Sequence, residues 1–391
     1  MKLQFVVPRY GVEILGGAES AARMLAERIV RYCDWDVEVL STCALDHISW
    51  ENELAPGKSE LNGVSVYRFI NEQGRLPEFF ELDAKLKLDP LAFTLAQSRD
   101  WVDLQGPISK GLLEAIETSD AEFIAFYPYL FHPSVIGVTK APSIKVLHPA
   151  AHDEPALYLD IFKKTFSAFD GFVYHAPAER RLAQRVMPIA HIPQITLGLG
   201  TIDPCGVGKA PSEIVNLGNS PYIISLGRID EMKGSVYLAE FFIEYKKIFP
   251  SNHKLLFVGP DLVKLPRNED IIVVGPVSEA DKWDLLRGAD LLISPSAYES
   301  FSLVIFEAWK SRVPVLVNSS CEVTLEHCKS SKGGVWFDSF RDFCSKLYIL
   351  LANSTIRSEL AENGFTYTQD MYNWENLVGR YCRFLERLGS R

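Results

Sequence analysis

Two carboxylates, Glu299 and Glu307, stand with seven residues between them in the segment SPSAYESFSLVIFEAWKSRVPVLVNS, residues 294–319. Short apolar runs lie on either side, at 290–294 and 314–318. Runs of this length, bounded by Pro and Ser, are typical of buried strands in a parallel sheet. The segment between them is therefore predicted as a loop that becomes a crossover helix.

This placement would give the two carboxylates a chemical role. Glu299 would lie at the carboxyl end of a strand, where open α/β sheets bind their ligands. Residues 300–303 are expected to open the helix, and their backbone N–H groups, which lack partners within the helix, can receive an anion. Glu307, about one turn further on, could accept hydrogen bonds from ligand hydroxyls. An anion site beside two hydroxyl acceptors describes a nucleotide sugar. A crossover helix with two incidental glutamates explains the same residues equally well.

Length and composition point to a two-domain globular protein. A chain of 391 residues is too long for one ordinary core. A hydrophobic content of 47% and a charged content of 23% are ordinary values. The net charge of −10 argues against nucleic-acid binding, which needs a basic surface. A local cluster, Arg180, Arg181 and Arg185, could contact anionic lipid headgroups, although a solvated helix face is the simpler explanation.

The chain has the features expected of a cytoplasmic protein. No stretch approaches the apolar length needed to span a bilayer. Residues 1–11, MKLQFVVPRYG, have too short an apolar run for a signal peptide. The seven cysteines are scattered without a CxxC pair, which favours reduced thiols. Cys321, His327 and Cys328 do not have a recognisable zinc spacing.

Strand-like segments alternate with helical patterns through the first half of the chain. A helix is expected at 18–31, so Gly16 and Gly17 would lie where a strand gives way to a helix. A ligand could approach the backbone closely there, although an ordinary turn also explains a glycine pair. The expected strands are Lys2–Val7, Val37–Thr42, Val64–Phe69, Phe123–Tyr127, Ile144–His148 and Gly171–His175.

A second polar group, His152, Asp153 and Glu154, follows the strand expected to end at His148. A histidine in this loop could exchange a proton or donate a hydrogen bond to a sugar hydroxyl. Capping of the next helix by Asp153, with Pro155 at the first helical position, explains the same loop structurally, and both roles can hold at once. His148 is the rival candidate for the active-site histidine.

The second half of the chain predicts another doubly wound sheet after a linker rich in Gly, Pro and Ser at 197–220. Its first strand ends in SLGRIDEMKG, which places Arg228 and Lys233 at the strand's carboxyl end. Two cations there would neutralise a diphosphate and stabilise it as a leaving group. Ordinary loop charges would be the simpler explanation, but the glutamate pair in the same sheet favours an anion site. The expected strands are Tyr222–Leu226, Lys254–Val258, Ile271–Val274, Asp290–Ser294, Pro314–Asn318 and Val335–Phe337.

Taken together, these motifs resemble the retaining GT-B glycosyltransferases, specifically glycosyltransferase family 4. The resemblance rests on GGAE at residues 16–19, GRIDEMKG, the E-x7-E pair and GLGTID at the end of the first half. The segments HDEP and HCKSSKGG resemble a subgroup associated with bacterial surface and exopolysaccharide assembly. The resemblance implies an α/β GT-B fold, in which two Rossmann-like doubly wound domains, residues 1–203 and 204–372, face a cleft. It also implies that the amphipathic helix at 373–391 returns to the first domain.

The resemblance further implies a role for each site residue. Arg228 and Lys233 match the basic pair that holds the donor diphosphate, and Glu299 matches the carboxylate on the transferred sugar. Glu307 matches the ribose ligand, and His152 falls where the family places a histidine beside the reacting sugar. Other donor contacts are implied at Gly16, Gly17, Val277, Ser300, Phe301, Ser302 and Leu303. Ser302 and Arg312 stand where the family usually has glycine, which leaves the identity of the sugar open.

The sequence thus predicts a retaining, metal-independent hexosyltransferase of polysaccharide biosynthesis, without a cofactor. The expected donor is a nucleotide diphosphate sugar, with UDP-glucose or a similar UDP-hexose favoured. The expected acceptor is a glycan or lipid-linked oligosaccharide, so the protein would work in the cytoplasm, at the inner membrane face if the acceptor is lipid-linked. A UDP-sugar epimerase of the same architecture and a non-catalytic nucleotide-sugar-binding scaffold are the alternatives. The linkage and the oligomeric state stay open at this point.

Overall fold

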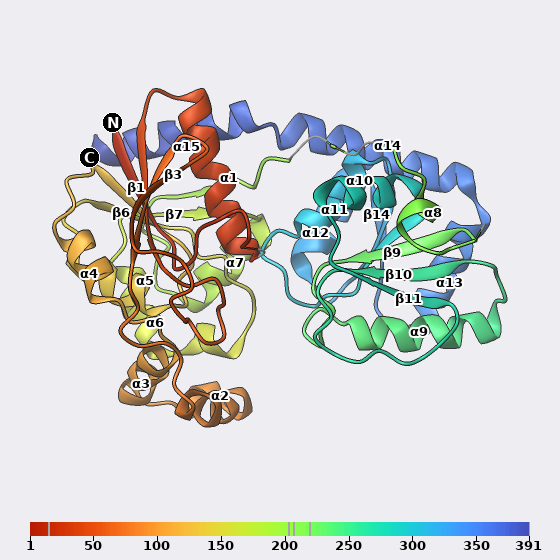
Figure 1. The fold of residues 1–391 in the computed structure, drawn as a ribbon, viewed down its shortest axis with the longest axis horizontal. Coiled ribbons are helices and arrows are strands. Elements are labelled where there is room, and N and C mark those ends of the chain that lie inside the picture. The colour runs from red at the N-terminus through yellow and green to blue at the C-terminus, as the bar shows by residue number, and fades with distance from the viewer. Residues whose placement is uncertain (15, 202–203, 206–207, 219, 391) are drawn as a thin grey trace. The chain divides into compact units, whose positions relative to one another are not determined.

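The computed structural model describes residues 1–14, 16–201, 204–205, 208–218 and 220–390, and it divides into two compact units (Figure 1). The amino-terminal unit comprises Met1–Leu199 and Trp374–Arg391, and the carboxyl-terminal unit comprises Gly200–Asn373. The domain boundary predicted between residues 203 and 204, and the end of the GLGTID motif, involve residues 202–203, which lie outside the described part.

The amino-terminal unit is built on one sheet with the order β3-β4-β2-β1-β5-β6-β7-β8. Neighbouring strands in this sheet are parallel, apart from β3 and β4, which are antiparallel. The direction of strand addition reverses between β1 and β5, which makes that edge the unit's topological switch point. The strands are β1 (Lys2–Val6), β2 (Asp36–Thr42), β3 (Gly57–Leu61), β4 (Val64–Phe69), β5 (Phe123–Phe126), β6 (Ile144–Leu147), β7 (Gly171–Tyr174) and β8 (Gln194–Thr196).

The six strands predicted in this half are present to within one residue at each end, and two further strands, β3 and β8, were missed. The sequence GKSEL of β3 is polar and almost wholly exposed, and β8 is only three residues long. Neither strand has the apolar run that marks a buried strand, because both lie at the ends of the sheet.

Helices cover both faces of this sheet (Figure 1). Side chains of α4 (Lys110–Glu117), α5 (His132–Lys140) and α6 (Asp160–Ser167) form the larger core with the strands. The closing helix α15 (Trp374–Gly389) packs beside α1 (Gly17–Tyr32). Arg380 of α15 donates to the Thr196 carbonyl of β8 at 2.6 Å. The predicted return of the last helix to the first domain is therefore observed.

The carboxyl-terminal unit has a parallel sheet with the order β11-β10-β9-β12-β13-β14. This is the Rossmann strand order, and it confirms the predicted α/β fold of this half. All six predicted strands are present to within one residue at each end. The strands are β9 (Tyr222–Leu226), β10 (Lys254–Val258), β11 (Ile271–Gly275), β12 (Leu291–Ser294), β13 (Val315–Asn318) and β14 (Gly334–Phe337).

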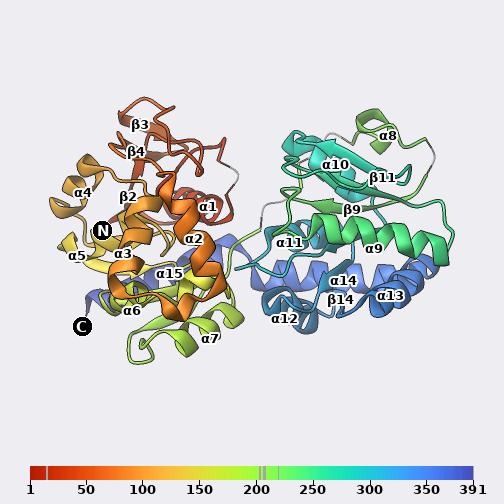
Figure 2. The ribbon, with the colours of Figure 1, turned by 90° about the horizontal axis from the view of Figure 1, so that it is seen from below.

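The helices α9 (Ser235–Ile248) and α13 (Phe340–Ala352) form a hydrophobic core with one face of this sheet (Figure 2). On the other side lie α10 (Glu279–Gly288) and α11 (Leu303–Lys310), the two helices that carry candidate site residues (Figure 1). Across the described ranges of both units, no helix has the length and apolar content required to cross a bilayer.

Candidate functional site

The switch point of the carboxyl-terminal sheet brings two of the predicted motifs together. Strands β9 and β12 are neighbours in the sheet, although long stretches of chain separate them. Lys233 follows β9 and Glu299 follows β12, and the Lys233 Nζ lies 2.8 Å from Glu299 Oε1. Ligands of doubly wound sheets bind at the carboxyl ends of strands at a switch point. The ion pair therefore lies at the sheet edge where doubly wound sheets bind their ligands.

The loop after β9 is ordered by Asp230, a residue that the sequence prediction missed. Its carboxylate accepts the backbone N–H of Lys233 at 2.7 Å and lies 3.4 Å from the Arg228 Nε. The next residue after Lys233, Gly234, has φ 73°, and a Cβ there would lie 3.0 Å from the carbonyl oxygen of Pro295. Glycine thus lets the loop after β9 pack against the loop after β12.

Both predicted cations are paired with carboxylates. Arg228 contacts Asp230, and Lys233 contacts Glu299. The side chains of Arg228 and Lys233 are 43% and 32% exposed, whereas that of Glu299 is only 13% exposed. A diphosphate could therefore reach both cations, and it would compete with the carboxylates for them.

The helix after the Glu299 loop begins later than the sequence predicts. The first residue of α11 is Leu303, so Ser300 and Phe301 precede the helix and do not open it. Ser302 adopts a left-handed conformation with φ 70° and ψ 69°, which interrupts the helical path. The Phe301 ring stacks on Phe306 at a centroid distance of 4.4 Å and fixes the preceding turn in the core. The N–H groups at the start of α11, including that of Leu303, remain a candidate anion site.

Ser302 and Arg312 both have positive φ angles, 70° and 58°, a backbone conformation that favours glycine. Ser302 is also almost completely buried, and its hydroxyl has no hydrogen-bond partner within the described residues. Ser302 therefore destabilises the fold in two ways. Its backbone is in the left-handed conformation, and its buried hydroxyl has no hydrogen-bond partner within the described residues.

We expect Ser302→Gly to raise the free energy of unfolding by about 1–2 kcal/mol, because it removes both effects. Ser302→Ala is the matched control, since it removes the hydroxyl but keeps the Cβ in the left-handed conformation. It should recover only part of the gain. Urea unfolding of the three proteins measures the differences, and a glycine variant that is less stable than the parent would contradict this account.

Glu307 is paired with a lysine that the sequence prediction missed. The Lys282 Nζ of α10 lies 2.8 Å from Glu307 Oε1 and 2.7 Å from Glu279 Oε2. Burial raises the pKa of Glu307, and Lys282 opposes that shift. Burial lowers the pKa of Lys282, but Glu307 and Glu279 outweigh it and the pKa lies above its usual value. Lys282 therefore favours the ionised form of the predicted ribose ligand. Val277, the predicted base contact, follows β11 at the same sheet edge.

The glycine pair of the amino-terminal unit lies at the start of α1, as predicted. Gly16 is the residue before the helix, and a Cβ there would clash with Glu19 Oε2 and lie 3.0 Å from the Arg9 Nη2. Arg9 and Glu19 are both buried, and the Arg9 Nε donates to Glu19 Oε1 at 3.1 Å. Among the described residues, no such neighbour lies within 4 Å of a Cβ on Gly17. Packing therefore requires glycine at position 16, whereas a Cβ at position 17 would extend into open space.

Gly16→Ala should reduce the free energy of unfolding by about 1–3 kcal/mol, because the added methyl group displaces the buried Glu19 carboxylate from Arg9. Gly17→Ala is the control. Its stability should equal or slightly exceed that of the parent, since alanine has a higher helix propensity than glycine. Thermal unfolding of both variants tests the difference. Equal losses at the two positions would show that the Arg9–Glu19 pair is not what demands glycine.

The two candidate histidines have different environments. His148 is fully buried, stacks on Tyr127 at 4.0 Å, and its Nε2 lies 3.1 Å from the Tyr381 hydroxyl of α15. Burial, with His175 nearby, lowers the pKa of His148. The His152 side chain is 32% exposed, and its Nε2 lies 3.4 Å from Glu154 Oε2. A ligand could touch His152 and not His148, so His152 stays the candidate and His148 has a packing role.

The predicted site residues thus form two groups. Arg228, Lys233, Val277, Glu299, Leu303 and Glu307 belong to the carboxyl-terminal unit, at or near the carboxyl edge of its sheet. Gly16, Gly17 and His152 belong to the amino-terminal unit and follow the ends of its strands β1 and β6. Their individual roles in binding and catalysis stay predictions.

The predicted site residues of the carboxyl-terminal unit lie within a segment that matches a known protein family. Residues 210–367 match the family model described as glycosyl transferases group 1. The unit carries a glycosyltransferase group 1 domain. That domain contains Arg228, Lys233, Glu299 and Glu307, and it covers 40% of the chain, or 158 of 391 residues.

A curated relative and two solved structures extend the comparison. The N,N'-diacetylbacillosaminyl-diphospho-undecaprenol alpha-1,3-N-acetylgalactosaminyltransferase of Campylobacter jejuni is 23% identical over 244 residues, 58% of this chain and 63% of that relative. The chain therefore spans less than two thirds of that protein. Sucrose-phosphate synthase from Thermosynechococcus elongatus has a TM-score of 0.70 at 16% identity, covering 100% of this chain and 99% of its own. Anabaena Alr3699/HepE, in complex with UDP and glucose, has a TM-score of 0.69 at 13% identity, covering 99% and 100%. These likenesses confirm the GT-B fold.

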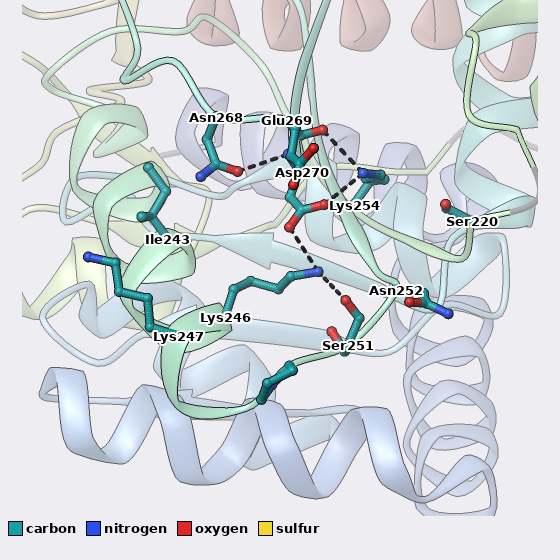
Figure 3. A pocket seen from close by; sticks show the side chains of 11 residues that line it. Ser220, Ile243, Lys246, Lys247, Ser251, Asn252, Lys254, Asn268, Glu269 and Asp270 are labelled. Carbon is teal, nitrogen blue, oxygen red and sulfur yellow. Dashed lines mark hydrogen bonds and ion pairs between the residues drawn. The ribbon is translucent and has the colours of Figure 1, made fainter.

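The group 1 domain also contains a hollow of about 440 Å³ that no predicted site residue lines (Figure 3). It lies beside the start of β10, at the amino ends of the strands, whereas ligands of such sheets bind at the carboxyl ends. Its cations Lys246 and Lys254 both pair with Asp270, at 3.0 and 2.7 Å. Both lysines are held by this one carboxylate, and the hollow lies at the opposite ends of the strands from the predicted site residues, so it is not the candidate nucleotide site. Within the described ranges, no three His, Cys, Asp or Glu side chains gather in a group that could hold a metal ion.

Proposed function

We propose that this protein is a glycosyltransferase that moves a hexose from a nucleotide diphosphate sugar to a glycan acceptor with retention of configuration. The observation that carries the proposal is the Lys233–Glu299 pair, 2.8 Å apart at the switch point of a group 1 domain. The pair combines a cation for the diphosphate with a carboxylate for sugar hydroxyls, and the two are close enough to contact one donor molecule.

In the proposed reaction, the bond between the anomeric carbon and the diphosphate oxygen breaks, and the diphosphate leaves with the bonding electrons. The acceptor oxygen bonds to the anomeric carbon on the same face, and its proton passes to the departing diphosphate. Arg228, Lys233 and the N–H groups at the start of α11 stabilise the charge that develops on the diphosphate. Because these groups supply the positive charge, we propose that no divalent metal is needed.

For the donor and acceptor, we propose a UDP-hexose and a lipid-linked or free glycan. The Anabaena protein forms a complex with UDP and glucose, which supports a uridine nucleotide. The name of the Campylobacter relative describes transfer of N-acetylgalactosamine to a diphospho-undecaprenol compound, which supports a lipid-linked acceptor. The GGAE, HDEP and HCKSSKGG segments support membership of glycosyltransferase family 4 and a role in polysaccharide assembly at the cytoplasmic membrane face.

A thermal-shift screen followed by product analysis tests the proposal. The screen uses UDP-glucose, UDP-N-acetylglucosamine, UDP-N-acetylgalactosamine and GDP-mannose, and a true donor at 100 times its Kd should stabilise the fold by about 2.7 kcal/mol. The stabilising donor is then incubated with and without a glycan acceptor, in the presence of a chelator. Transfer with the donor's anomeric configuration supports the proposal. Interconversion of the sugar without acceptor would indicate an epimerase, and no stabilisation and no turnover by any donor would contradict nucleotide-sugar chemistry.

A further inference from the structure

A buried carboxylate in the amino-terminal unit connects two strand-end loops. Glu179 lies in the first turn of α7 (Pro177–Val186) and is only 1% exposed. Its Oε2 accepts the backbone N–H of His175, at the end of β7, at 2.7 Å. Its Oε1 accepts the backbone N–H of Ala151, in the loop after the neighbouring strand β6, at 2.9 Å. The residue after Ala151 is His152.

The loop that carries His152 is held on both sides of the histidine. On one side, Glu179 binds the amide of Ala151, and Ala150 has a φ of 51°, a conformation that a non-glycine residue keeps only when its surroundings impose it. On the other side, Tyr129, which is buried, donates its hydroxyl to Glu154 Oε1 at 2.7 Å. The His152 side chain extends from a short segment whose two ends are fixed.

A simpler role for Glu179 is capping of its own helix. A glutamate at the third helical position commonly accepts the backbone N–H of the N-cap residue, which is Ala176 here, and His175 directly precedes that residue. Capping does not require a contact with Ala151 in another loop. It also does not require burial, which raises the pKa of Glu179, whereas the backbone N–H donors around it lower that pKa and favour the carboxylate form. Glu213 of α8 (Pro211–Ile214) shows the ordinary case, since it is exposed and accepts the N–H of Ala210, at 2.7 Å.

We propose that Glu179 is a positioning residue that sets the orientation of His152 by holding the backbone of Ala151. The inference rests on the proposed function and on the role predicted for His152 beside the reacting sugar. A carboxylate suits this task because its two oxygens accept N–H groups from two neighbouring strand ends at once. Glu179 therefore holds the loops after β6 and β7 together as one unit. A displacement of about 1 Å of a group that is positioned in an active site can reduce the reaction rate 10²-fold.

Glu179→Gln tests the proposal, because glutamine has the same size but replaces one acceptor oxygen with an NH2 group that cannot accept an N–H. We expect kcat to fall by about ten- to hundredfold, with the KM for the donor unchanged. The same change is then made in a His152→Ala background, where it should cause no further loss of kcat. Glu213→Gln is the matched control, and it should leave kcat at the parental value in both backgrounds.

Several outcomes would overturn the proposal. Equal losses of kcat from Glu179→Gln in the parent and in the His152→Ala background would show a general structural role. A His152→Ala enzyme with the parental rate would leave no catalytic histidine to position.

Hydrogen exchange of the parent protein decides the case if Glu179→Gln does not fold. The amide of Ala151 should exchange far more slowly than an unprotected loop amide, and free exchange would contradict the contact. A parent protein that turns over no nucleotide sugar contradicts the proposed function. The Ala151 exchange rate still reports independently whether Glu179 holds the loop.

Discussion

Replacing Lys233 with alanine should slow sugar transfer by about 10²–10³-fold, the loss that follows removal of one charge-stabilising donor. The Lys233 ammonium lies 2.8 Å from Glu299 at the sheet edge where we place the donor diphosphate. Negative charge grows on the diphosphate as the sugar leaves, so the effect should fall mainly on kcat at saturating donor. Steady-state kinetics with the donor found in the thermal-shift screen measures it.

The control for this experiment is Lys247→Ala. Lys247 is an exposed lysine of the same unit, and it pairs with Glu244 at 2.6 Å, away from the predicted site residues. Its removal should leave kcat unchanged. Because Lys233→Ala leaves Glu299 without this partner, the far-UV circular dichroism and unfolding midpoint of the variant are recorded with the kinetics. A folded Lys233→Ala enzyme with the parental kcat would refute the role assigned to this lysine.

The second large effect is expected at Lys282. Lys282→Met should lower the free energy of unfolding by about 2–3 kcal/mol, because it leaves the Glu307 carboxylate without its cation in a mostly buried position. The value is below that of a fully buried pair because about a fifth of each side chain is exposed, 18% for Lys282 and 20% for Glu307. Urea unfolding measures the loss. The affinity for the nucleotide sugar should fall as well, since Glu307 loses the group that orients it.

The double variant Lys282→Met/Glu307→Gln separates the charge from the packing. It removes both charges, and it should therefore recover most of the stability lost in Lys282→Met while nucleotide binding stays weak. Lys209→Met is the control, because Lys209 forms an exposed pair with Asp281 at 2.7 Å and exposed pairs contribute about 0–1 kcal/mol. If Lys282→Met and Lys209→Met lowered the free energy of unfolding by the same small amount, Lys282 would not be the group that stabilises the Glu307 carboxylate.

The strands show why much of the fold could be predicted from the sequence. Strands such as Tyr222–Leu226 and Leu291–Ser294 are covered on both faces, so each consists largely of consecutive apolar residues that can be recognised in the sequence. The same logic fails for β3 and β8 at the ends of the amino-terminal sheet, where short length or solvent exposure removes that pattern. The start of α11 was placed too early because the left-handed turn at Ser302 depends on how Phe301 packs in the core.

The sequence by itself determined the two-domain α/β architecture and the residue types of the candidate site, because apolar runs and the motifs around Lys233 and Glu299 are local patterns. Tertiary structure alone decided which of these residues meet. The order of strands makes β9 and β12 neighbours, and no spacing in the chain specifies the 2.8 Å contact between Lys233 and Glu299. The folded chain also buries His148 but not His152. It brings Glu179 to the Ala151 amide and Lys282 to Glu307, because the surroundings of a polar side chain come from segments that are distant in the sequence.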